Sequence, residues 1–268
     1  MRQCHGPLDA SVSRRRNLSI TEGAVPRNTG LVGTGHELQI SIRSALVDGD
    51  GRRIVSALAD EFWGDLLQVA GDALLVALAQ SVEGASELAR QCSQGLRDRA
   101  WQGDIELADE LDRALGTRAE PSLRPLAVDL EELVAILEGD PSHGGGRVDL
   151  HTGEIWPESA IDYAREVGDE IPDDEEPDRW LWVWCEGSRD AYRDMEYFIE
   201  ALGDEDRAAR LSIAIMGRGA FRRFKDVLAC WPDDLERWYA FSNERQRGRA
   251  RAWLAAAGYS PRQSECPT

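Results

Sequence analysis

The chain has 268 residues, of which 42% are hydrophobic, and it carries a net charge of −18. The apolar residues and nine tryptophans exclude a wholly disordered chain, because they suffice for a packed interior. The longest apolar run, residues 73–79, is too short to cross the hydrocarbon of a bilayer, so we expect no membrane span.

Cysteine and histidine usage indicates the compartment and excludes familiar metal motifs. The five cysteines are odd in number, widely spaced and without a Cys-x-x-Cys pair, which favours free thiols in a reducing cytoplasm. The four histidines fall in the first 36 residues or in expected loops, and neither they nor the cysteines form a metal-binding pattern. We therefore expect a cytoplasmic protein without a metal or cofactor.

The first half of the chain predicts an arm, a helical bundle and a linker. Residues 1–36 are poor in large apolar side chains and are predicted to be a disordered arm. Residues 37–116 carry leucines at helical spacing, interrupted by glycines, and predict a bundle of three or four short helices. Residues 117–126 contain two prolines and no periodicity, which is typical of a linker.

Residues 127–258 begin with a helix and continue into strands. Asp129 precedes an apolar run and is expected to cap a short helix. Residues 147–156 predict a β-hairpin, and residues 168–178 predict an exposed acidic loop. Trp180, Trp182 and Trp184 alternate with apolar residues, so we expect them in the core of a sandwiched or central strand.

The chain then returns to helices. Ser188 is expected to cap the first of them, and Gly217 to end the second. Asp233 and Glu236 predict a capping box for the last helix, with a kink or break between Asn243 and Gly248. Residues 259–268 are predicted to be a flexible tail. The expected fold class is α+β: an N-terminal helical bundle, then a small sheet of hairpin and Trp-rich strand packed with four to five helices.

An ordered set of motifs between residues 126 and 258 resembles an uncharacterised bacterial protein family. The motifs are Asp149-x-x-Thr152-Gly153-Glu154, Met195-x-x-Phe198-Ile199, Ala214-Ile-x-Gly217-x-Gly219-Ala-Phe-Arg-Arg-Phe-Lys-Asp226, Trp238-Tyr239-x-Phe241 and Trp253-Leu254. The resemblance covers about half the chain and implies a shared domain. It implies no activity, because the family has no established substrate or catalytic residue.

Charge is distributed unevenly along the second half of the chain. Residues 120–206 hold 26 acidic and 6 basic side chains, whereas residues 207–251 hold 11 basic and 5 acidic ones. One interpretation is internal: the basic helices lie near the acidic segment and lower its self-repulsion through a screened, long-range effect. The other is a binding face for an acidic protein surface or a phosphate-bearing ligand. Its candidate residues are Arg218, Arg222, Arg223, Lys225, Arg245 and Arg249, with Arg247 and Arg251 beside them.

The sequence predicts a non-enzymatic interaction or regulatory module. No nucleophile with its base, no metal-ligand spacing and no catalytic carboxylate pair is recognisable, so no catalytic residue is assigned. Two alternatives stay open: a nucleic-acid-associated protein, disfavoured because the net negative charge repels phosphate backbones, and an enzyme with an unrecognised site.

Overall fold

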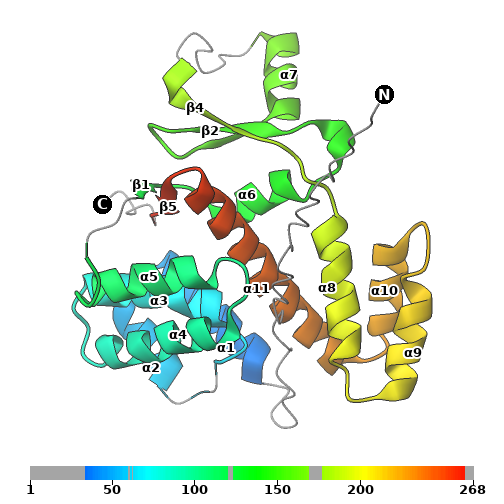
Figure 1. Ribbon diagram of the computed structural model, residues 1–268, viewed down its shortest axis with the longest axis horizontal. Helices are drawn as coiled ribbons and strands as arrows, with labels where there is room; N and C mark the ends of the chain where they lie inside the picture. The colour runs from blue at the N-terminus through cyan, green and yellow to red at the C-terminus, as the bar shows by residue number, and fades with distance from the viewer. Residues whose placement is uncertain (1–33, 60, 62, 120–122, 169–176, 263–268) are drawn as a thin grey trace, which may run out of the picture.

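The computed structural model describes residues 34–59, 61, 63–119, 123–168 and 177–262. The predicted arm, apart from residues 34–36, lies outside these ranges, as does most of the predicted acidic loop. The described residues form an α+β fold, as predicted. They contain two small sheets instead of the one expected, and six helices follow the bundle instead of four to five. One long helix, α11, crosses the molecule between an N-terminal bundle and the remaining elements (Figure 1).

An N-terminal helical bundle forms as the leucine spacing predicts, but with five helices instead of the three or four expected. They are α1 (Thr34–Val47), α2 (Gly51–Ala59), α3 (Leu67–Ala79), α4 (Ala85–Arg99) and α5 (Asp104–Ala114). α3 lies at the centre, and most of its side chains are buried among leucines and alanines of the other helices. Burial of this apolar surface is what holds the short helices together, because none is long enough to be stable alone in water.

The second half supplies six helices and five short strands. They are β1 (Arg124–Leu126), α6 (Leu130–Leu137), β2 (Gly146–Asp149), β3 (Ile155–Pro157), α7 (Glu158–Val167), β4 (Trp180–Val183), α8 (Arg189–Glu200), α9 (Glu205–Ala214), α10 (Ala220–Leu228), α11 (Pro232–Ala256) and β5 (Tyr259–Pro261). Short 3-10 helices occupy Pro141–His143 and Pro177–Arg179. β1 pairs in parallel with β5, so parts of the predicted linker and tail are hydrogen-bonded to each other.

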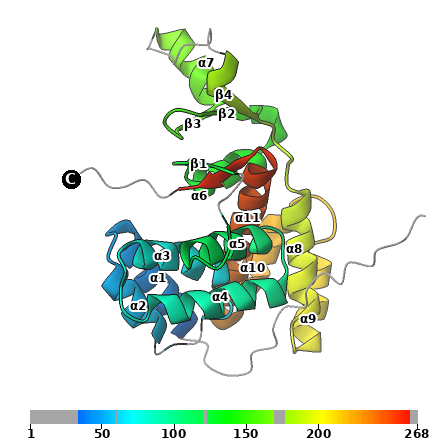
Figure 2. The ribbon, with the colours of Figure 1, turned by 60° about the vertical axis from the view of Figure 1, so that its left-hand side comes forward.

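The predicted hairpin is confirmed, because β2 and β3 pair antiparallel with Val148 opposite Ile155. β4 pairs with the other side of β2, which gives the order β3-β2-β4. The sheet lies above α6 and α11 (Figure 2), and Val148, Ile155 and Val183 pack into the same core as these helices. The expectation of a sandwiched or central Trp-rich strand is wrong, because β4 is an edge strand whose other face is only partly covered.

The tryptophans of this strand have different environments. Trp180 is buried, whereas Trp182 and Trp184 are 56% and 75% exposed. The prediction that all three belong to the core is therefore wrong for Trp182 and Trp184. Alternation along β4 directs Leu181 and Val183 toward the core. Trp180 and Trp182 therefore lie on the other face of the strand.

Helix ends were predicted with mixed success. Asp129 caps α6 as expected, since its carboxylate accepts hydrogen bonds from the amides of Glu131 and Glu132. Ser188 is the N-cap residue of α8, but its side chain makes no capping hydrogen bond. The predicted capping box at α11 does not form: the helix begins at Pro232, and its N-cap residue is Trp231. Proline suits this first position because the amide that it lacks would have no helical partner.

α11 runs without a break from Pro232 to Ala256, so the kink predicted near Gly248 is wrong. Gly248 serves a close contact instead. A Cβ built on it would lie 2.1 Å from the carbonyl oxygen of Gln102, and one built on Gly103 would lie 2.0 Å from the carbonyl oxygen of Gly248. These two glycines let α11 pack directly against the turn that precedes α5.

α11 contacts helices of both halves of the molecule. On one side it packs against α1, α3 and α5, and on the other against α6, α8 and α10. An aromatic cluster fills part of the second contact, where Trp238 lies 4.8 Å from Phe224 and 5.4 Å from Phe198 between ring centroids. Trp101, which precedes α5, joins this cluster edge-on against Phe241. The bundle and the second half therefore share a core around α11.

Candidate functional site

Two of the predicted binding residues on α11 are engaged inside the molecule. Arg245 donates to Asp194 at 2.9 Å, and Arg249 donates to the other oxygen of Asp194 at 2.8 Å. Arg249 also donates to Glu138, at the end of α6, at 2.6 Å. Asp194 is fully buried. Arg245 and Arg249 therefore hold α8 and α6 against α11, and the guanidinium groups that make these bonds face the inside of the molecule.

The two neighbouring arginines of α11 reach the N-terminal bundle. Arg247 and Arg251 both donate to the buried carboxylate of Asp72 on α3. Arg251 also donates to Gln68 and to Glu110, each at 3.1 Å. Burial acts to raise the pKa of Asp72, but the charges of Arg251 and Arg247 and their hydrogen bonds lower it below its ordinary value. Asp72 is thus held as an anion between two guanidinium groups.

Glu110 differs from Asp72 although it shares the same arginine. Burial raises the pKa of Glu110 to about 7, and the nearby charge of Asp72 adds to this rise, against the lowering effect of Arg251. One of its carboxylate oxygens is buried without a hydrogen-bond partner. Glu110 is the group in this cluster whose charge changes near neutral pH.

Glu244 forms a second connection between α11 and the bundle. Its carboxylate accepts hydrogen bonds from the backbone amides of Gln68 at 2.7 Å and Val69 at 3.1 Å, in the first turn of α3. Arg99 donates to the same carboxylate at 3.0 Å and makes two hydrogen bonds to Asp104. The internal interpretation of the charge pattern is therefore supported for α11, but as short, buried ion pairs instead of a long-range effect.

Arg223 has a structural position on α10. Its guanidinium donates to the backbone carbonyls of Ala214, at 3.0 Å, of Met216 and of Arg218. These carbonyls belong to the end of α9 and the following turn, where helix geometry leaves acceptors without a partner. Arg223 therefore closes the α9–α10 turn, a role that does not require an outside ligand.

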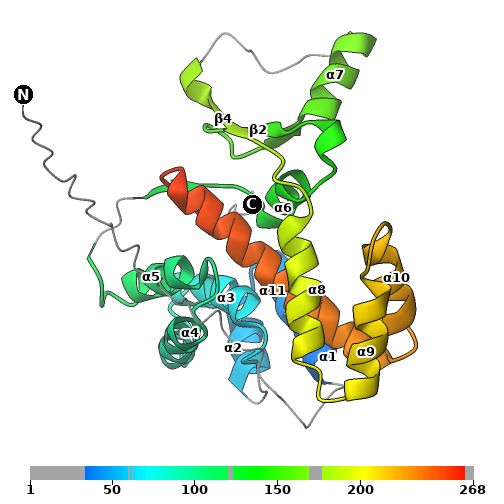
Figure 3. The same ribbon diagram turned by 45° about the vertical axis from the view of Figure 1, so that its right-hand side comes forward.

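The remaining predicted residues lie at the surface. Arg218, Arg222 and Lys225 are exposed, and Arg222 has only a distant ion pair of 3.8 Å with Asp226. Arg218 and Lys225 form no ion pair with another described residue. Two apolar side chains of the same α9–α10 segment, Ile213 and Met216, are each 68% exposed. We call these five residues, Ile213, Met216, Arg218, Arg222 and Lys225, the turn surface; it belongs to α9 and α10, on the far side of α8 from the bundle (Figures 1 and 3).

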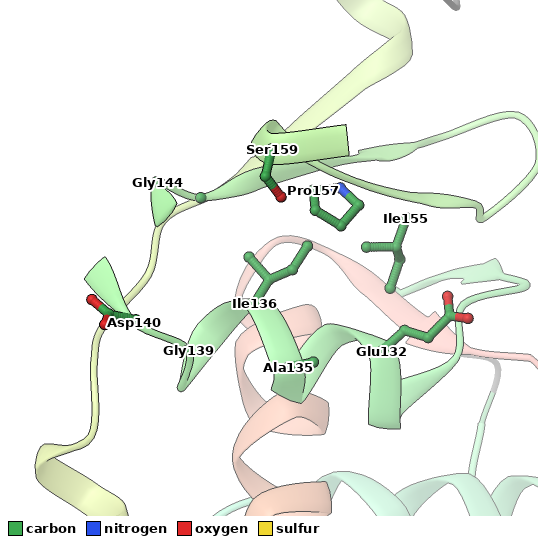
Figure 4. Close-up of a pocket in the computed structure, with 10 residues that line it drawn as sticks. Glu132, Ala135, Ile136, Gly139, Asp140, Gly144, Ile155, Pro157 and Ser159 are labelled. Carbon is green, nitrogen blue, oxygen red and sulfur yellow. The ribbon is translucent and has the colours of Figure 1, made fainter. Parts of the chain in front are cut away.

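A pocket of about 430 Å³ lies between α6 and the hairpin (Figure 4). Ile136, Ile155 and Pro157 form its apolar centre, and Glu132 and Asp140 lie toward opposite ends. Ser159 is the hydroxyl in its lining, which includes neither histidine nor cysteine. The pocket therefore offers a hydroxyl and two carboxylates but no histidine or cysteine, and its residues do not identify a reaction.

Two further features are absent from the described residues. Within these ranges, no group of three or more histidine, cysteine, aspartate or glutamate side chains is arranged to hold a metal ion. No described helix combines the length and the apolar character that crossing a membrane requires.

Similarity to other proteins is concentrated in the second half of the chain, where the sequence motifs also lie. Residues 150–265 match the model of an uncharacterised protein family, UPF0158. A protein of Pseudomonas aeruginosa, named UPF0158 protein PA5073, is 29% identical over 153 residues, which cover 54% of this chain and 93% of that protein. The expected resemblance to an uncharacterised family is confirmed. The comparison with solved structures found no match.

The ion-pair partners of the α11 arginines lie both inside and outside the residues that match UPF0158. All the arginines of α11 lie within residues 150–265, and so does Asp194. Asp72 and Glu110, which bind Arg251, lie in the bundle before that range. The buried ionic cluster thus joins the UPF0158 segment, residues 150–265, to a part of the chain that the family model does not cover.

No local sequence pattern marks the buried carboxylates that lie on α11 or bind it. Glu244, Asp72 and Glu110 were not distinguishable from surface carboxylates, because helical spacing alone does not show which charged face is covered by another helix. The local excess of arginine on α11 was the signal that pointed to them, since buried cations need carboxylate partners.

Proposed function

We propose that this protein is a non-enzymatic interaction or regulatory module that binds an acidic protein surface through the turn surface. Within this proposal the protein acts in the cytoplasm, as the scattered, odd-numbered cysteines indicate. The observation that carries the proposal is the separation of the basic side chains into two groups. Those of α11 are occupied by internal carboxylates, whereas Arg218, Arg222 and Lys225 project into solvent.

The composition of the turn surface supports a protein partner over a free phosphate group. Ile213 and Met216 expose apolar surface in the same α9–α10 segment that carries the cations. Protein interfaces combine an apolar centre with a charged rim, and methionine and arginine are enriched in them. A small phosphate ligand would not bury the exposed apolar side chains.

The field of the whole molecule argues against nucleic acid as the partner. The net charge of −18 repels a long polyanion. Three cations would also release few counterions from a duplex, so this contribution to binding would be small. An acidic patch on a folded protein carries less charge and can approach the turn surface locally. Its association would be weakened by salt, because the cations involved are exposed.

The proposal is tested with a labelled amphipathic peptide of alternating glutamate and leucine, measured by fluorescence anisotropy. We expect the double substitution R218E/K225E to weaken binding by at least tenfold, because two attractions become repulsions. The matched control is R52E/R189E, which changes the net charge equally at two other exposed arginines. Circular dichroism melts should agree between the two variants.

Three results would contradict the proposal. The first is equal peptide binding by R218E/K225E and R52E/R189E, which would show a nonspecific charge effect. The second is selective binding of inorganic polyphosphate, and the third is selective binding of duplex DNA, in each case with loss of binding in R218E/K225E. Those outcomes would assign the turn surface to a phosphate-bearing ligand.

A further inference from the structure

A second surface, opposite in charge to the turn surface, lies on the small sheet and its neighbouring elements. Residues 140–168 and 177–187, which we call the β lobe, contain eight acidic residues, seven of them exposed, and three arginines. Arg165 and Arg179 form ion pairs with Asp162 and Asp149. The β lobe projects from α6 and α11 (Figures 1 and 2), so its negative charge is presented to solvent over several elements.

Two tryptophans are exposed on this acidic lobe. Trp182 is on the edge strand β4, and Trp184 follows the strand. With 56% and 75% of their surfaces accessible, they leave large aromatic faces in water close to each other in the chain. Tryptophan is among the most buried residue types on average, and adjacent exposed ones indicate a contact surface.

The sheet already binds one cation against this face. Arg147 of β2 is buried, and its guanidinium carbon lies 4.2 Å from the ring centroid of Trp180 and 6.0 Å from that of Trp182. These distances are typical of attraction between a cation and an aromatic ring. The same chemistry is available on the exposed surface of the Trp184 ring and on the part of the Trp182 ring that Arg147 leaves exposed.

We propose that Trp182 and Trp184, set in the acidic β lobe, bind an arginine- or lysine-rich segment of another protein. The carboxylates attract the segment over several ångströms, and the two rings receive its cationic side chains and their apolar stems. This inference does not rest on the proposed function, because it concerns a different surface and a partner of opposite charge.

Charge complementarity favours this occupant over two others. Nucleic-acid bases can stack on tryptophan, but the eight carboxylates of the β lobe, against three arginines, repel the phosphates that accompany them. A second copy of the chain could present its turn surface, yet each copy carries a net charge of −18 and repels the other. A basic segment is attracted by the carboxylates of the β lobe and is not repelled by the net negative charge of the protein.

The experiment uses the full chain and a fluorescein-labelled peptide of eight arginines, with binding followed by anisotropy. We expect the wild-type protein to bind the peptide and W182S/W184S to bind it about tenfold more weakly, since two exposed cation–π contacts are lost. The phenylalanine variant W182F/W184F should lose less, because it keeps aromatic faces. Y239S, which removes an exposed aromatic of α11, and R218E/K225E should bind like the wild type.

The single variant W184S distinguishes loss of peptide binding from a folding defect. Trp184 lies outside β4 and is 75% exposed, so its replacement should leave the thermal melt unchanged while weakening the peptide complex. Equal binding by wild type, W184S and W182S/W184S would overturn the proposal, because acidic charge alone would then explain capture. Preferential binding of single-stranded oligothymidylate would also overturn it. So would concentration-dependent self-association in sedimentation that W184S abolishes.

Discussion

The carboxylate of Glu244 on α11 accepts a hydrogen bond of 2.7 Å from the backbone amide of Gln68 in the first turn of α3. The residue that precedes α3, Leu66, has no side chain that can satisfy these amides. A residue 176 positions further along the chain therefore performs the capping that serine or aspartate usually performs locally. Arg99 neutralises the same carboxylate, so the cap is also an ion pair.

This relationship predicts a large stability effect for a single residue of α11. Glu244→Ala should lower the free energy of unfolding by about 3–5 kcal/mol, because it leaves Arg99 partly unpaired and two amides of α3 without an acceptor. Urea denaturation measures the change. Glu196→Ala, which removes an exposed carboxylate from α8, is the control and should change stability by less than about 0.5 kcal/mol. A similar, small effect of both substitutions would refute the capping role.

The two groups of arginines should respond differently to substitution. Arg249→Ala leaves Asp194 with one cation fewer and Glu138 without its close partner, so we expect a loss of about 3 kcal/mol. Arg222→Ala removes a side chain that is 89% exposed and should change stability by less than about 0.5 kcal/mol. Thermal melts of the two variants under the same conditions make the comparison. If Arg249→Ala melts like the wild type, the internal role of the α11 arginines is refuted.

The close approach of α11 to α5 can be tested at a glycine. Gly248→Ala places a methyl group 2.1 Å from the backbone oxygen of Gln102. This oxygen belongs to the main chain, so a change of side-chain rotamer cannot relieve the clash. We expect a loss of about 2 kcal/mol or more, although alanine favours helix by about 1 kcal/mol over glycine. Gly35→Ala is the control, since Gly35 also lies in a helix, α1, and nothing lies within 4 Å of its added Cβ. A stabilised Gly248→Ala variant would show that the helices are not in contact at this point.

The ionisation of Glu110 predicts how stability depends on pH. Its pKa is about 7 in the folded chain, above the ordinary value of 4.5, so the folded state holds this proton more tightly than the unfolded state. Stability from this group is complete below about pH 4.5 and is lost as the pH rises to about 7. This contribution to the free energy of unfolding is about 3 kcal/mol, because each unit of difference between the folded and unfolded pKa is worth about 1.4 kcal/mol.

The measurement is a series of urea titrations between pH 5 and pH 8. Glu110→Gln should flatten the decline of unfolding free energy over this range relative to the wild type. The groups that face Glu110 are Arg251 of α11, Asp72 of α3 and Arg113 of α5, and they remain in the variant. An unchanged slope in Glu110→Gln would assign the pH dependence to another group.

Local patterns in the sequence were enough to predict the elements but not their partners. Leucine spacing predicted the bundle, and Asp129 predicted the start of α6, because both depend on neighbours along the chain. Gly248 was misread because a glycine that weakens a helix and one that permits close packing look identical in sequence. Trp182 and Trp184 were misread because alternation shows that side chains share a face and does not show whether anything covers it.

The candidate site was predictable to a similar extent. The local excess of basic side chains was visible, but its division into buried arginines on α11 and exposed ones on α10 depends on contacts with Asp194, Asp72 and Glu138. These carboxylates are separated from their arginines by tens of residues or more. Only the packing of α11 between two sets of helices determines which cations remain free.

The pairing of β1 with β5 has a mechanical consequence. The amide of Arg124 donates to Gly258 and that of Arg262 donates to Leu126, so this half of the chain returns to the place where it starts. Because the two strands are parallel, tension applied at residues 124 and 262 pulls them lengthwise past each other and loads their bonds together. A molecule stretched in this way would resist first at this clasp, before any helix of the second half uncoils.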